Sequence, residues 1–201
     1  MKMSESNNKL TVKDLITTGV FSAIIFFAIS FGGGFFAMIP AVTFYFPVGA
    51  SLFAGPIFLL MIAKVPKTGP IMIVSILMAL FCFLTGMHYT MAVGYLVCGI
   101  LAEILAHTRK YKSIRMNIFS YMVFCFGGTA TYITYYVNPQ GWIKFMLNKG
   151  TEQQYIDIMT DSATTFVLVT MLIGTVVIGW LSGVVGSKLL KKHFEKAGIT
   201  A

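Results

Sequence analysis

Long apolar segments alternate with short connections in this chain, and the basic residues fall almost entirely in every second connection. Of the 15 Lys and Arg residues, all but two lie in four short segments. These are Lys2, Lys9 and Lys13; Lys64 and Lys67; Arg109, Lys110, Lys112 and Arg115; and Lys188, Lys191, Lys192 and Lys196. Basic residues near the ends of membrane spans are retained on the cytoplasmic side. The pattern therefore predicts a multi-pass membrane protein with both termini and the second and fourth connections in the cytoplasm.

The composition agrees with a lipid environment for most of the chain. Apolar residues make up 57% of the 201 residues and charged residues only 11%, which departs from an ordinary soluble domain. A helical span needs about 20 residues, so the apolar segments predict one all-α integral membrane domain over 1–201 with six transmembrane helices. The spans are expected at about 12–31, 48–63, 69–85, 91–107, 116–137 and 162–190.

Two connections at the predicted outer face are long enough to carry structure of their own. Gly32, Gly33 and Gly34 are expected to end the first helix. The segment 35–47 then holds two prolines and an aromatic cluster, which predicts an irregular connection that partly re-enters the membrane. Residues 138–161, between the fifth and sixth spans, place large apolar side chains at helical spacing. Two short interfacial helices are therefore predicted in that connection.

The sequence contains no recognisable catalytic set. It has no HExxH, GxSxG or Walker A motif, each of which would place reactive groups at a known spacing. We therefore expect no enzyme activity in this chain and no cofactor. The net charge of +8 follows from the membrane orientation, so no nucleic-acid partner is expected. The basic segments can instead contact the anionic lipids of the bilayer.

Aromatic and polar side chains gather in the three predicted outer connections, which favours a site for a small ligand there. Apolar pockets with a few placed polar groups are how small molecules are held. The candidate binding residues are Phe44, Tyr45, His88, Tyr89, Tyr132, Tyr136, Asn138 and Trp142. The alternative is an aromatic belt, since Tyr and Trp favour the membrane interface.

Three further residues add polar chemistry at the same predicted face. Lys144 and Lys149 are the only basic residues expected outside, where they could engage a ligand carboxylate or phosphate or remain solvated. No metal site is expected. His88 or Met87 would become a ligand only if the bound molecule were an iron chelate or haem.

Small side chains on the first predicted helix mark a face where another helix could pack closely. Gly19 and Ala23 stand four residues apart, with Ser22 beside them. Small residues at this spacing let two membrane helices approach. They are the candidate docking positions for a partner membrane protein.

The chain resembles the substrate-binding S components of energy-coupling factor (ECF) transporters, and more narrowly the bacterial membrane proteins called Trep_Strep. The resemblance is most specific in 54–58, in 63–69 and in the opening Leu10–Leu15. It implies residence in a bacterial cell membrane, a transmembrane coupling subunit and two cytoplasmic ATPases as partners, and a vitamin-like or metal-related ligand bound at the outer face. In S components an AxxxA-like motif docks on the coupling subunit, and Gly19 and Ala23 occupy the matching positions.

Two other classes of function stay open at this stage. A self-sufficient secondary carrier or channel would use ion gradients, and Glu103 is the best intramembrane carboxylate to couple them, although its position near the basic inner segment also suits an interfacial salt bridge. An intramembrane enzyme or assembly factor would depend on His88 or Glu103. The first interpretation, an importer subunit that binds a small, partly apolar or aromatic nutrient, accounts for the most features.

Overall fold

The computed structural model describes residues 9–196, and within that range it contains helices and no strand. The elements are α1 (Val12–Ala37), the 3-10 helix η1 (Pro40–Tyr45), α2 (Phe46–Lys64), α3 (Pro70–Leu84), α4 (Tyr89–His107), α5 (Ile114–Cys125), the 3-10 helix η2 (Phe126–Thr129), α6 (Ala130–Val137), α7 (Pro139–Asn148), α8 (Gln153–Ser162) and α9 (Thr165–Lys196). The all-α prediction is confirmed.

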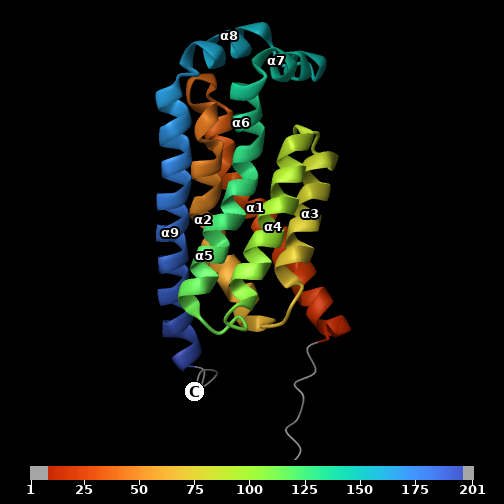
Figure 1. Ribbon diagram of the computed structural model, residues 1–201, viewed down its shortest axis with the longest axis vertical. Helices are drawn as coiled ribbons and strands as arrows, with labels where there is room; N and C mark the ends of the chain where they lie inside the picture. The colour runs from red at the N-terminus through yellow and green to blue at the C-terminus, as the bar shows by residue number, and fades with distance from the viewer. Residues whose placement is uncertain (1–8, 197–201) are drawn as a thin grey trace, which may run out of the picture.

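Most of the helices run side by side along one axis, while α7 and α8 lie across one end of the bundle (Figure 1). The connections that follow α2 and α4, the start of α1 and the end of α9 all lie at the opposite end. The basic segments of the sequence belong to these connections and helix ends, so we call this the basic end. Lys2, which was grouped with them, lies outside the described residues.

Four helical segments in the described part of the chain are long and apolar enough to cross a membrane. They are Val12–Ala37, Pro40–Lys64, Tyr89–His107 and Thr165–Lys192. The predicted third span corresponds to α3, which is apolar but has only 15 residues. The predicted fifth span is divided into α5, η2 and α6. Length alone therefore does not identify α3, or the series α5, η2 and α6, as a membrane span.

The first helix begins where its sequence predicts. The Asp14 N–H donates to Thr11 Oγ1 at 3.2 Å, and the Thr11 N–H donates to Asp14 Oδ2 at 2.8 Å, which together form a capping box. Each of these bonds satisfies a backbone donor that has no partner inside the helix.

The prediction that Gly32–Gly34 end this helix is wrong, because α1 continues to Ala37. Two of the three glycines are buried against α2. A Cβ at Gly32 would collide with the Gly49 carbonyl oxygen, and one at Gly33 would collide with the Phe46 ring. These glycines therefore let two helices pack closely instead of terminating one.

The predicted irregular connection over 35–47 is also wrong in its extent. Residues 35–37 complete α1, residues 40–45 form η1, and α2 starts at Phe46, which leaves only Met38 and Ile39 between helices. Pro40 and Pro47 each occupy the first turn of their helix, where proline is tolerated because the N–H that it lacks would have no helical partner.

A hydroxyl from α9 supplies a hydrogen bond that α2 lacks because of a proline. Pro56 lies inside α2 and has no N–H, so the Leu52 carbonyl, four residues earlier, loses its helical donor. The Ser182 hydroxyl donates to that carbonyl at 2.5 Å and accepts from the Gly55 N–H at 3.2 Å. A Cβ at Gly55 would collide with the same hydroxyl oxygen. Gly55 thus leaves space for the Ser182 hydroxyl, and Pro56 leaves free the carbonyl to which that hydroxyl donates.

Replacing Ser182 with Ala is expected to destabilise the fold by about 1–3 kcal/mol, because the Leu52 carbonyl would lose its donor and the buried Gly55 N–H its acceptor. The measurement is the thermal unfolding midpoint of the purified protein in detergent. Ser187→Ala is the matched control, since the Ser187 hydroxyl donates to Val184 in its own helix. Equal midpoints for both variants would contradict this role of the Ser182 hydroxyl.

Candidate functional site

A cavity of about 430 Å³ lies at the end of the bundle where α7 and α8 cross it. It is formed by residues from the end of α1, η1, the start of α2, the turn between α3 and α4, α4, α6, α7 and the segment from Thr151 into α8. We call it the end pocket. Its volume falls in the range of small-molecule sites. No single helix builds it, so its shape depends on the packing of the whole bundle.

The walls of the end pocket are mostly aromatic and thioether groups, with four threonines among them. Phe46, Met91, Tyr132 and Trp142 line it and are all buried. The Trp142 indole N–H donates to Thr131 Oγ1 at 3.1 Å, which fixes the ring plane. Rings held in this way offer a large apolar surface without losing much conformational freedom when a ligand binds.

Three of the eight predicted binding residues line this pocket, namely His88, Tyr132 and Trp142. Met87, the conditional metal ligand, also lines it. In the described residues, no group of three or more His, Cys, Asp and Glu side chains could hold a metal ion.

The other five predicted binding residues lie outside the lining and have different contacts. Phe44 is fully buried and packs against three tyrosine rings, including that of Tyr132, behind the pocket wall. The Tyr45 hydroxyl lies 2.7 Å from Thr170 Oγ1, and the Tyr136 hydroxyl donates to the Thr164 carbonyl at 3.1 Å. Asn138 accepts from the Gly141 N–H and caps α7, whereas Tyr89 is 58% exposed.

Several lining residues were not among the predicted set. Phe145 and Met146 follow Trp142 at three and four residues along α7, a helical spacing that the sequence already displayed. The Tyr155 hydroxyl donates to the Ala37 carbonyl at 2.7 Å, and this bond joins α8 to the end of α1. Met91 and Thr43 gave no sequence signal, because an isolated apolar or hydroxyl residue in an apolar segment is ordinary.

His88 is the titratable ring in the pocket wall, and its surroundings favour the neutral form. It caps α4 by accepting from the Thr90 N–H at 3.4 Å through Nδ1, and the Thr90 hydroxyl lies 2.7 Å from the same nitrogen. Burial lowers the pKa of His88 from its ordinary value, since desolvation disfavours the charged imidazolium. At neutral pH the His88 ring in the pocket wall is therefore uncharged, with one nitrogen that donates a hydrogen bond and one that accepts.

A second cavity of about 600 Å³ lies at the basic end, between the connections that follow α2 and α4. Beside it, Glu103 accepts from the Gly69 and Met72 N–H groups, each at 3.0 Å, and from the Tyr111 hydroxyl. Burial and then the hydrogen bond to Glu103 raise the pKa of Tyr111. The carboxylate thus ties the start of α3 to the connection after α4.

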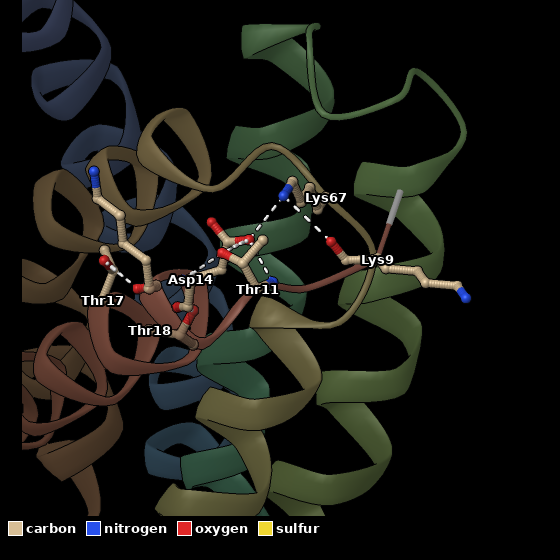
Figure 2. Close-up of polar contacts among 7 residues, drawn as sticks. Lys9, Thr11, Asp14, Thr17, Thr18 and Lys67 are labelled. Carbon is tan, nitrogen blue, oxygen red and sulfur yellow. Dashed lines mark hydrogen bonds and ion pairs between the residues drawn. The ribbon is translucent and has the colours of Figure 1, made fainter. Parts of the chain in front are cut away.

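The start of α1 is fastened to the connection after α2, as Figure 2 shows. Lys67 Nζ lies 2.7 Å from Asp14 Oδ2 and donates to the Lys9 carbonyl at 3.3 Å. In the next turn, Thr18 is fully buried and its hydroxyl donates to the Asp14 carbonyl. The contacts of Lys67 therefore join the start of α1 to the connection after α2.

The candidate docking residues on α1 differ in accessibility. Ser22 is fully buried and its hydroxyl donates to the Thr18 carbonyl at 2.8 Å. Gly19 and Ala23 are half-buried, and a Cβ at Gly19 would meet nothing within 4 Å. A partner helix could therefore reach Gly19 and Ala23 but not Ser22.

Lowering the pH is expected to destabilise the protein through His88. Its pKa in the folded protein is below the unfolded value, so the unfolded state takes up a proton first, and stability falls as the pH drops through the ordinary histidine range. In His88→Gln this part of the acid sensitivity should disappear. The check is the unfolding midpoint of both proteins between about pH 7.5 and about pH 5.5. Identical acid dependence in the two proteins would show that His88 is not the group responsible.

Comparison with known families finds a match over most of the chain. Residues 12–196 match the family described as hypothetical bacterial integral membrane protein (Trep_Strep). No curated protein and no solved structure matches the chain.

Proposed function

This chain belongs to the Trep_Strep family of hypothetical bacterial integral membrane proteins, and we propose that it is the substrate-specificity (S) component of an ECF-type importer. In this role it captures a small, partly apolar or aromatic micronutrient, either a vitamin-like compound or a metal chelate such as haem. It performs no chemistry itself. A transmembrane coupling subunit and two cytoplasmic ATPases would supply the energy for import.

The observation that carries the proposal is the position of the end pocket relative to the basic end. The pocket lies where α7 and α8 cross the bundle, and the basic connections lie at the other end. If the basic end faces the cytoplasm, as the distribution of Lys and Arg indicates, the pocket faces the outside of the cell. A scavenged nutrient would arrive at that side, and ATPases would be available at the other.

The proposed membrane arrangement has six crossings. Besides the four long helices, α3 would form the third crossing and the series α5, η2 and α6 the fifth. The 15 residues of α3 rise about 22 Å, which is shorter than a hydrocarbon core of about 30 Å, so the bilayer would thin or the chain ends would extend the span. On this arrangement α7 and α8 lie at the outer membrane interface and both termini in the cytoplasm.

The contacts of Glu103 support this role over a self-sufficient carrier. A coupling carboxylate must exchange protons or ions during transport. Here both carboxylate oxygens already accept hydrogen bonds, from the Gly69 and Met72 N–H groups and from Tyr111. Releasing them would leave the start of α3 without its cap.

The test is co-purification of the tagged chain, expressed in its own host, with a coupling membrane protein and two ATPases. In the same preparation, mass spectrometry and absorbance spectra identify the retained small molecule, and a haem would show a Soret band. A chain that moves its ligand unaided as a homo-oligomer would contradict the proposal.

Gly19→Leu is expected to reduce the co-purified ATPases by about tenfold or more, because a large side chain would block a close helix contact. Gly34→Leu is the control, since Gly34 lies on the same helix and a Cβ there also meets nothing within 4 Å. The yields of partner proteins per tagged chain give the measurement. Equal losses in both variants would argue that α1 does not dock through Gly19.

A further inference from the structure

The end pocket has an unbalanced charge. None of its lining residues is Asp or Glu, and its one permanently charged lining residue is Lys149. In a site walled by aromatic and thioether groups, water screens a charge less than at an open surface. The pocket therefore presents a positive potential to whatever enters it.

Lys149 follows α7 in the sequence, but its side chain extends toward the turn that follows α3. It follows the last residue of α7, and its ammonium lies so close to the turn after α3 that a Cβ at Gly86 would collide with Nζ. Gly86 has a φ of +68°, a conformation that favours glycine. Glycine at position 86 therefore has two effects: it allows the positive φ of the turn, and its lack of a Cβ leaves space for the Lys149 ammonium.

The ammonium has no anionic partner in the described part of the chain. The ion pair between Lys67 and Asp14 lies at the other end of the bundle and does not involve Lys149. Lys149 Nζ instead lies 5.2 Å from the centre of the Phe145 ring, a weak cation–π contact. Lys144, the other basic residue outside the basic segments, does not line the pocket.

A second hydrogen-bond donor stands in the same wall. His88 Nδ1 accepts from the Thr90 N–H at 3.4 Å and lies 2.7 Å from the Thr90 hydroxyl, which can donate to the same nitrogen. With Nδ1 accepting from both groups, we assign the proton of the neutral ring to Nε2. In the described residues no group accepts a hydrogen bond from His88 Nε2. An anion in the pocket could therefore accept from both the imidazole and the ammonium.

We infer that the ligand of the end pocket is an organic monocarboxylate, with its carboxylate held by Lys149 and His88 and its apolar body against Phe46, Tyr132 and Trp142. This inference rests on the proposed capture function and specifies its substrate class. A carboxylate carries one charge and accepts hydrogen bonds from several directions. One ammonium and one neutral imidazole match that charge, whereas a phosphate dianion would leave one charge without a cationic partner in the pocket wall.

The test compares ligands that differ only in charge. The isolated full-length chain in detergent is titrated with a panel of aliphatic, phenyl and indole monocarboxylates, for example indole-3-acetate, and with the corresponding neutral amides, for example indole-3-acetamide. Binding is read from the thermal unfolding midpoint and from quenching of tryptophan fluorescence. The small molecules that co-purify with the wild-type chain are extracted and identified in parallel.

Carboxylates are expected to bind the wild-type protein about tenfold or more tightly than their amides, because charge-assisted hydrogen bonds are stronger. Lys149→Gln should abolish this preference, and Lys144→Gln should retain it. A preference for amides, or an equal preference in wild type and Lys149→Gln, overturns the inference while leaving capture of another ligand class intact. If no carboxylate binds and no small molecule co-purifies, the capture function fails, and the inference fails with it.

Discussion

The bundle depends on satisfying every backbone hydrogen-bonding group in a medium that offers no water. Pro56 creates one unsatisfied group, because it removes a donor from the middle of α2 and leaves the Leu52 carbonyl without its helical partner. The Ser182 hydroxyl from α9 fills that place. The bond requires α9 to approach α2 closely, and Gly55 and Gly186 allow the approach because a Cβ at either would collide with the other helix. The same contact therefore fixes both the hydrogen bonding of α2 and the position of α9 beside it.

The close packing around α2 also determines where a cavity can form. On the other side of α2, Gly32 and Gly49 bring α1 equally near, so α1, α2 and α9 form a dense layer. The hairpin of α3 and α4 is shorter, and Figure 1 shows α7 extending across the bundle beyond the tip of that hairpin. The end pocket lies between these parts, with Gly86 and His88 from the hairpin and Trp142 from α7 in its lining. Its volume thus comes from helices of unequal length, whereas small voids between well-packed helices hold no ligand.

Features that depend on composition or on neighbouring residues could be predicted from the sequence. Features that depend on tertiary packing could be predicted only in part. The capping box at Thr11 and Asp14 was predictable because it is local, and the helical content followed from the apolar segments. The end of α1 was not predictable, since three consecutive glycines serve equally as a helix terminus or as a close-packing surface, and only the partner helix decides between them. Three of the eight candidate binding residues line the end pocket, because aromatic residues near helix ends gather at the same end of the bundle, and their role in binding stays a prediction. Phe44 and Tyr45 do not line the pocket, and the sequence could not exclude them because it does not show which side chains of η1 reach the cavity and which pack behind its wall.

The two lysines outside the basic segments show how a charge pattern changes its meaning once the fold is known. In the sequence Lys144 and Lys149 are equivalent, as both are exceptions to the same rule. In the structure they are five residues apart across the end of a short helix, and only Lys149 turns back over the pocket toward Gly86. A protein that binds but does not react must obtain selectivity from burial and from a few fixed charges. Because no lining residue of the end pocket is acidic, Lys149 there is not neutralised by the wall, and its charge remains available to distinguish an acid from a neutral molecule of the same shape.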